Sequence, residues 1–135
     1  MTHFVAGLGT TGTFTGTVRR LKEFNPDLRA IALQPDNPMH GLEGWKHLET
    51  AQVPRIFDPT LEDERLVIAS EDAYDMIQGI ASQTGLLISP SSAANLVGAQ
   101  RVAATLKEGV VVTVLPDSLE RYEEVAEHIF GKSWL

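Results

Sequence analysis

Short apolar runs separated by longer mixed segments set the pattern of this chain. The runs contain mainly Val, Ile, Leu, Ala and Phe, and they have the length of buried β-strands. They cover residues 4–6, 29–33, 66–69 and 110–115. The run at 110–115 is the clearest, because only Thr113 in it is polar, and we expect it to be buried on both faces as in a parallel sheet.

In the segments between these runs, apolar residues recur at the spacing of an α-helix. A first helix is predicted over 13–24, with Phe14, Val18, Leu21 and Phe24 on one face, and Asn25-Pro26 ends it. A second is predicted to begin after Ser70 as its N-cap and to end at Gly85. Further helices are predicted from the serines at 91–92 to Leu106, and around Tyr122, Ala126 and Ile129.

Alternation of strands and helices indicates an α/β fold. We expect a three-layer arrangement, a mostly parallel sheet with helices on both faces, formed by residues 1–135 as a single domain. The segment 35–60 interrupts the alternation and is rich in proline, but it also carries apolar residues such as Trp45 and Phe57. A loop on the substrate side and a simple packing role both fit this segment.

Composition excludes several classes of function. The formal net charge of −7 and the lack of a Lys/Arg cluster argue against nucleic acid as a partner. No apolar run approaches the length of a membrane span, and no secretory leader is recognisable. Zero cysteines exclude disulfides and thiolate chemistry, so a cytoplasmic location is the default. The four histidines lack ligand-like spacing, and we expect no metal site.

The stretch from Gly7 to Thr13 is the strongest candidate for binding. It follows an apolar run and precedes a helix, so glycine backbone, threonine hydroxyls and the helix N-terminus would surround an anion. Gly7, Gly9 and Gly12 match the G-x-G-x-x-G pattern of a dinucleotide site. That site also needs an acidic residue after the second strand, where Gln34-Pro35 stands instead. A phosphate monoester bound by Gly9, Thr10, Thr11, Gly12 and Thr13 therefore fits better.

Two other stretches follow apolar runs and could face the same crevice. Ser89 to Ser92 follows the short run at 86–88 and leads into the third helix, and Pro116 to Ser118 follows the run at 110–115. Ser91 or Ser92 could equally be a helix N-cap. Neither serine lies in a G-x-S-x-G elbow, and Lys22, Lys46, Lys107 and Lys132 stand in polar contexts, so no catalytic nucleophile is assigned.

Four stretches, taken together, resemble the cysteine synthase and cystathionine β-synthase family of pyridoxal-phosphate (PLP) enzymes, in that family's order. Residues 4–16 resemble its phosphate loop, usually G-T-G-G-T, with Thr11 in place of a glycine. Residues 53–58 resemble its "VPxxxD" stretch, and residues 85–94 resemble "GILVGISSGAA". Residues 115–122, Leu-Pro-Asp-Ser-Leu-Glu-Arg-Tyr, resemble "LPDSGERY". The resemblance extends over nearly the whole chain.

The resemblance implies a fold and a set of cofactor contacts. The fold would be that of the large domain of tryptophan-synthase-β-like PLP enzymes. Gly9, Thr10, Thr11, Gly12 and Thr13 would bind the cofactor phosphate, and Ser91 would hydrogen-bond the pyridine nitrogen. Pro116 and Asp117 would lie near the same edge of the ring. The implied reaction replaces the leaving group of an activated serine, O-acetylserine or O-phosphoserine, with sulfide to give cysteine.

The resemblance also implies what this stretch does not carry. The family's Schiff-base lysine lies in an N-terminal half, and the chain resembles the C-terminal half, so we expect the isolated chain to be inactive. Partners implied are a small amino-acid substrate, serine acetyltransferase or the missing half, and a second copy in a homo-oligomer. The loop at Gly41 to Trp45 departs from the family's common pattern, which leaves the substrate open. A dinucleotide-binding module and a non-catalytic remnant that binds a partner are the alternatives.

Overall fold

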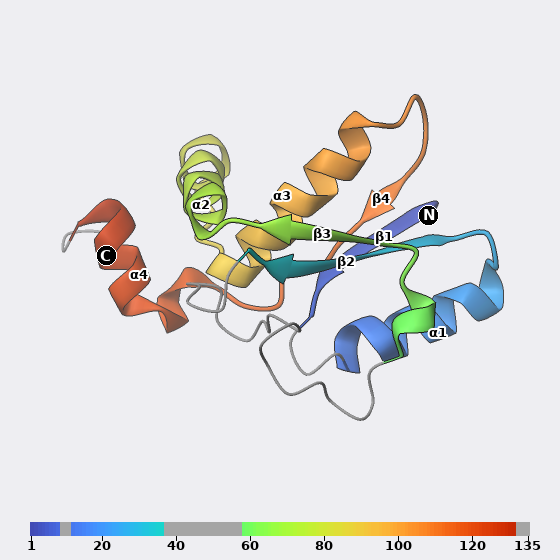
Figure 1. Cartoon of the computed structure of the whole chain (residues 1–135). Helices are drawn as coiled ribbons and strands as arrows, with labels where there is room; N and C mark the ends of the chain where they lie inside the picture. Colours follow the sequence, from blue (N-terminus) through green and yellow to red (C-terminus); the bar gives the residue numbers. More distant parts are fainter. Residues whose placement is uncertain (9–11, 37–57, 132–135) are drawn as a thin grey trace.

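A parallel four-stranded sheet forms the centre of the fold (Figure 1). The computed structural model describes residues 1–8, 12–36 and 58–131. The order in the sheet is β3-β2-β1-β4, and β1 pairs with β2 from His3↔Arg29 to Gly7↔Leu33. The strands are β1 (His3–Gly7), β2 (Arg29–Pro35), β3 (Glu64–Ile68) and β4 (Val111–Val112).

Helices cover both faces of the sheet, as expected for the fold class. Helix α1 lies on one side and α2 and α3 on the other (Figure 1). The described helices are α1 (Gly12–Phe24), α2 (Ser70–Thr84), α3 (Pro90–Ala104) and α4 (Glu123–Phe130), with short 3₁₀ turns η1 (Pro59–Leu61) and η2 (Leu119–Arg121). These bounds confirm the helices expected over 13–24 and around residues 122–129.

Successive side chains of the central strands point to opposite faces of the sheet, so the core has two parts, one on each face. On β1, Phe4 and Ala6 face α1, whereas Val5 faces α2 and α3. On β2, Ala30 and Ala32 likewise face α1, whereas the larger residues Ile31 and Leu33 face α2 and α3. Successive side chains of a strand point to opposite faces, so nearly continuous apolar runs are what a sheet covered on both sides requires.

The run at 110–115 differs from its expected complete burial. Only Val111 and Val112 pair in the sheet, beside His3 and Phe4 of β1. Val110 is 55% exposed and Leu115 is 48% exposed. The reason is position, because β4 is an edge strand of the described sheet and diverges from β1 after two pairs. The composition of a strand shows how apolar it is, but it does not show whether the strand lies at the centre or at the edge of the sheet.

Two helix details also correct the sequence-based expectations. Helix α2 begins at Ser70 itself, with Ala69 as the N-cap residue, and the Ala73 amide donates to the Ala69 carbonyl. Phe24, expected on the buried face of α1, is 74% exposed, and the Arg20 guanidinium lies 4.5 Å from the centre of its ring. The expected left-handed cap at Gly85 is confirmed, with φ of 77°.

The segment 37–57, including the loop at Gly41 to Trp45, lies outside the described residues.

Asp63 ties three elements together and gives a pH-dependent prediction. Its Oδ2 accepts hydrogen bonds from Lys22 Nζ in α1 (2.8 Å) and from the Ala30 amide in β2 (2.7 Å). Partial burial raises the pKa of Asp63, but these two hydrogen bonds and the charge of Lys22 outweigh burial, and the net pKa lies below its ordinary value. The charged form is therefore favoured by folding.

Replacing Asp63 by asparagine is expected to lower the free energy of unfolding by about 1 kcal/mol at pH 7. Because the folded pKa is depressed, the contribution is complete above the unfolded value of about 4 and is lost as pH falls through the folded pKa. Urea unfolding of both proteins from pH 7 to pH 3 measures this difference. The exposed Asp27→Asn variant is the control, and a D63N deficit that persists unchanged at pH 3 would contradict the account.

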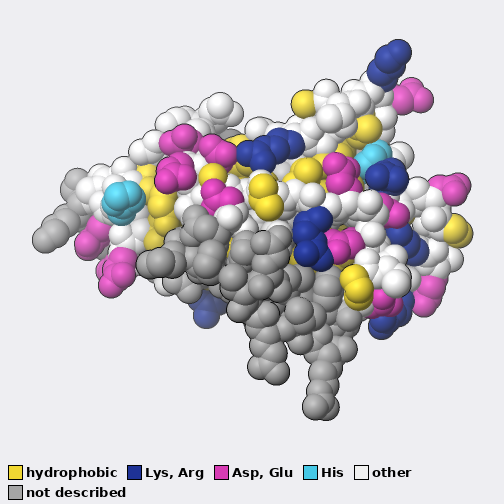
Figure 2. Space-filling model, in the orientation of Figure 1, with side chains coloured by type: hydrophobic (Ala, Val, Ile, Leu, Met, Phe, Trp, Pro, Cys, Tyr) yellow, Lys and Arg dark blue, Asp and Glu magenta, His cyan; other side chains and the backbone are white. Residues whose placement is uncertain are grey.

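Charged side chains are intermixed on the face shown in Figure 2, where Lys and Arg lie among Asp and Glu. Among the described helices, none combines the length and apolar character needed to cross a bilayer. Within residues 1–8, 12–36 and 58–131, no three His, Asp or Glu side chains are placed to hold a metal ion.

Candidate cofactor-phosphate site

The candidate site lies at the point of the sheet where the strand order changes direction. From β1 the chain moves outward through β2 to β3, and then returns to place β4 on the opposite side of β1. In open parallel sheets, ligands bind beyond the carboxyl ends of the strands at such a switch point. Here that point lies between the end of β1 and the segment that follows β4.

Main-chain pairing between β1 and β4 stops before this edge, and side chains replace it. Thr113 Oγ1 donates to the Val5 carbonyl at 2.6 Å. Further along, Asn95 of α3 accepts from the Gly7 amide through Oδ1 at 3.0 Å and donates through Nδ2 to the Val114 carbonyl at 2.9 Å. The two strand ends are therefore held apart but connected.

The start of α3 brings the serine stretch to the same edge. Ser89 is the N-cap residue, and its Oγ accepts from the Ser92 amide at 3.2 Å and lies 2.8 Å from the Ser92 hydroxyl. The hypothesis that Ser91 or Ser92 caps this helix is therefore wrong. The reason is Pro90, which suits the first helical position and keeps Ser89 extended before it. This arrangement leaves the hydroxyl of Ser91 available for another role.

Ser91 has the weakest contacts of the three serines. It is 7% exposed, and its Oγ lies 3.4 Å from Ser89 Oγ, which is near the limit of a hydrogen bond. A hydroxyl has one donor and two acceptor positions, so Ser91 keeps hydrogen-bonding capacity for other groups.

The stretch after β4 lies against these serines. Ser92 Oγ donates to the Asp117 carbonyl at 3.2 Å, the Leu119 amide donates to the Leu87 carbonyl at 3.0 Å, and Ile88 forms an antiparallel bridge with Ser118. The Asp117 carboxylate accepts from the Tyr122 hydroxyl through Oδ2 at 2.6 Å, while its buried Oδ1 has no hydrogen-bond partner among the described residues. The structure thus brings together two of the three stretches expected to share a crevice.

The glycine-rich stretch is described only in part. Leu8 is buried and its amide donates to the Leu33 carbonyl at 2.8 Å, and α1 begins at Gly12. Gly12 and Thr13 therefore lie in the first turn of α1, at the positive end of the helix dipole. Gly9, Thr10 and Thr11 lie outside the described residues.

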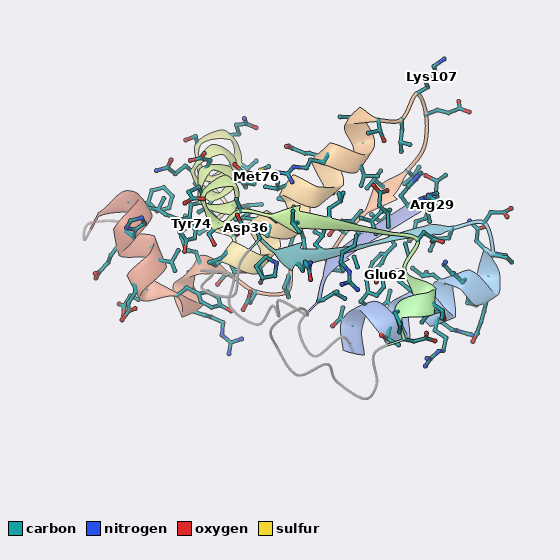
Figure 3. The ribbon with its side chains drawn as sticks, in the orientation of Figure 1. Arg29, Asp36, Glu62, Tyr74, Met76 and Lys107 are labelled. Atoms are coloured by element: carbon teal, nitrogen blue, oxygen red, sulfur yellow. The ribbon has the colours of Figure 1, made fainter. Side chains whose placement is uncertain are left out.

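The two described lysines are far from this edge. Lys22 lies in the last turn of α1, about 15 Å along the helix from Gly12, and pairs with Asp63. Lys107 follows the C-terminal end of α3, and in Figure 3 it projects at the top of the view, well away from Asp36, which follows β2. Lys46 and Lys132 lie outside the described residues.

Comparison with known proteins assigns the chain to a family. A model of the family described as pyridoxal-phosphate dependent enzyme matches residues 1–117. The chain belongs to this family of PLP-dependent enzymes. It is 44% identical over 126 residues to cysteine synthase of Aquifex aeolicus (strain VF5), a match that covers 90% of this chain and 38% of that protein.

Two further relatives agree with this assignment. Cysteine synthase B of Escherichia coli (strain K12) is 34% identical over 134 residues, covering 98% of this chain and 43% of that protein. The crystal structure of the O-acetylserine dependent cystathionine β-synthase from Helicobacter pylori aligns with a TM-score of 0.82 and 34% identity, over 92% of this chain and 42% of that one. The chain thus spans about two fifths of the length of these relatives.

The family assignment and the fold class confirm the resemblance found in the sequence. The cofactor of this family is pyridoxal phosphate. The dinucleotide-binding module expected as an alternative from Gly7, Gly9 and Gly12 finds no support in these matches. The donors present fit the cofactor chemically, because a helix N-terminus suits its phosphate and the loosely bound hydroxyl of Ser91 suits a neutral ring nitrogen.

Asn95 and Thr113 are the residues at this edge that the sequence did not single out. Each is a lone polar residue in an apolar surrounding, Asn95 among the small residues of α3 and Thr113 among β-branched residues. Their position among apolar residues was the signal that could have marked them, because a buried polar side chain needs hydrogen-bond partners.

Proposed function

We propose that this chain forms the cofactor-phosphate part of a PLP-dependent enzyme of the cysteine synthase type. The observation that carries the proposal is the contact of the serines that begin α3 with the segment around Asp117, together with the hydrogen bond that joins Gly7, at the end of β1, to Asn95 of the same helix. Family membership and similarity to cysteine synthases support the choice of cofactor and reaction class.

Each residue has a defined task in this proposal. Gly9, Thr10, Thr11, Gly12 and Thr13 bind the phosphate, using amides and hydroxyls at the positive end of α1. The Ser91 hydroxyl hydrogen-bonds the pyridine nitrogen. Because Ser91 is neutral, it does not stabilise a protonated ring nitrogen as a carboxylate would.

When bound, the cofactor supplies an electron sink for loss of a leaving group from the β-carbon of the amino-acid substrate. The neutral serine moderates that sink, which favours β-replacement over transamination. The substrate proposed is an activated serine, O-acetylserine or O-phosphoserine, and sulfide is the nucleophile that gives cysteine. The same proposal includes serine acetyltransferase and a second copy of the chain as partners.

The proposal assigns the Schiff-base lysine to a part of the enzyme outside this stretch. Neither described lysine lies near the switch point, since Lys22 is paired with Asp63 and Lys107 lies at the other end of α3. Alone, the chain is proposed to be inactive.

Reconstitution tests the proposal. The chain is co-expressed with the part of the Aquifex aeolicus cysteine synthase that it does not match, and cysteine formation from sulfide is measured with O-acetylserine and with O-phosphoserine. We expect PLP-dependent activity with one of the two substrates only when both parts are present. Reconstituted pairs that bind PLP but produce no cysteine from either substrate would contradict the proposed reaction.

A further inference from the structure

The carboxamide of Asn95 lies at the point where β1 and the segment after β4 separate. Between β1 and β2 the pairing continues to Gly7, but between β1 and β4 it ends at Phe4. Three residues further along β1, the gap is bridged by Asn95, whose Oδ1 and Nδ2 bind the Gly7 amide and the Val114 carbonyl. One side chain thus takes the place of a direct main-chain contact.

The contacts of Asn95 require a carboxamide. Asn95 is 3% exposed, and its side chain uses one acceptor and one donor, which bind a donor and an acceptor of the main chain. A carboxylate of the same shape would bind the Gly7 amide but would repel the Val114 carbonyl. An alanine would leave both main-chain groups without this partner in a partly buried place.

The position of Asn95 links the two ends of the proposed cofactor site. Gly7 lies two residues before Gly9, where the phosphate stretch begins, and Asn95 lies one helical turn after Ser91 in α3. The bond from Gly7 to Asn95 therefore connects the end of β1, two residues before the phosphate stretch, to the helix that carries the serine proposed for the ring nitrogen. The bond to Val114 extends the connection toward Asp117.

We propose that Asn95 is a positioning residue that holds the switch point open by the width of one carboxamide, and that it fixes the phosphate stretch relative to Ser91. This inference rests on the proposed function, because it assigns the positioning to the cofactor site. Asn95 acts through Gly7 and α3 and does not itself touch the cofactor.

Amide exchange tests the contact without any ligand. In the Asn95→Ala variant, hydrogen exchange of the Gly7 amide, measured by NMR, is expected to accelerate about tenfold or more relative to the Phe4 and Val5 amides. An unchanged rate at Gly7 would overturn the inference. The Ile77→Val variant removes one methylene from the core in α2 and serves as the control, since it should leave the rates at Gly7 and Val5 in their original ratio.

PLP affinity tests the consequence for the site. The Asn95→Ala variant is expected to bind PLP about tenfold more weakly than the unmodified chain, while Ile77→Val, folded under the same conditions, binds as the unmodified chain does. Unchanged PLP affinity of Asn95→Ala, with binding by the unmodified chain intact, would overturn the positioning role alone. Failure of the unmodified chain to bind PLP would overturn the proposed function instead, and the exchange result at Gly7 would still decide the contact.

The Asn95→Asp variant provides a conservative rescue. When protonated, an aspartic acid offers one carbonyl acceptor and one hydroxyl donor, which match the Gly7 amide and the Val114 carbonyl. The PLP dissociation constant of Asn95→Asp, divided by that of the unmodified chain, is therefore expected to fall as pH is lowered from 8 to 5.5. Taking the ratio removes the titration of the PLP phosphate itself. A ratio independent of pH, like that expected for Asn95→Ala, would contradict the donor role of Asn95.

Discussion

Replacing Phe14 by alanine is expected to lower the free energy of unfolding by about 3–5 kcal/mol. Phe14 is completely buried, and it packs with Phe4, Ala6 and Leu8 in the core between α1 and the sheet. Removing its ring leaves a cavity under the first turn of α1, the turn that carries Gly12 and Thr13. Urea unfolding followed by circular dichroism measures the change, and PLP binding should weaken together with stability.

The matched control for Phe14 is Phe24 at the other end of the same helix. Phe24 is 74% exposed, and the Arg20 side chain covers its ring. The Phe24→Ala variant is therefore expected to change the free energy of unfolding by no more than about 0.5–1 kcal/mol. Equal destabilisation by the two substitutions would mean that α1 does not pack as described.

Replacing Gly98 by alanine is expected to lower the free energy of unfolding by about 1–3 kcal/mol, although alanine favours helices. A Cβ atom on Gly98 would lie 2.5 and 2.7 Å from Cδ1 and Cδ2 of Leu33, a side chain that is itself completely buried. Helix α3 must therefore move away from β2, or Leu33 must leave its rotamer. Chemical denaturation measures the loss.

Two further variants make the Gly98 test specific. Gly79 lies in α2, and a Cβ atom added there would meet no neighbouring atom within 4 Å, so Gly79→Ala should raise the free energy of unfolding by about 0.5–1 kcal/mol. Shortening the neighbour, as in Leu33→Val, should cost less in the Gly98→Ala background than in the unmodified chain. Additive effects of Gly98→Ala and Leu33→Val would contradict the contact.

Apolar periodicity was sufficient to predict the class of fold and most of its elements. The strand at residues 4–6, the first helix and the cap at Gly85 follow from local rules, because burial, helix spacing and left-handed geometry each leave a mark in neighbouring residues. The order of the strands in the sheet has no such signal in neighbouring residues. That is why the run at 110–115 was expected to be fully buried, although β4 is an edge strand of the described sheet.

The candidate site was predicted in its parts but not in its connections. The stretches at Gly7 to Thr13, Ser89 to Ser92 and Pro116 to Ser118 each show their character locally, through glycines, serines and a proline after a strand. The contact between Gly7 and Asn95 joins residues 88 positions apart, and no local pattern contains it. The cap at Ser89 was missed for a smaller reason, because the proline that follows it makes α3 begin at Pro90, before the two serines at which the start was expected.

Titration of the purified 135-residue chain with PLP, with inorganic phosphate as competitor and borohydride treatment afterwards, tests the central claim most directly. The account predicts saturable PLP binding that phosphate displaces, and no pyridoxyl group attached to the chain after reduction. Binding that phosphate does not displace would contradict the assignment of the phosphate to Gly9 through Thr13. A pyridoxyl group attached to Lys22, Lys46, Lys107 or Lys132 would contradict the assignment of the Schiff-base lysine to another part of the enzyme.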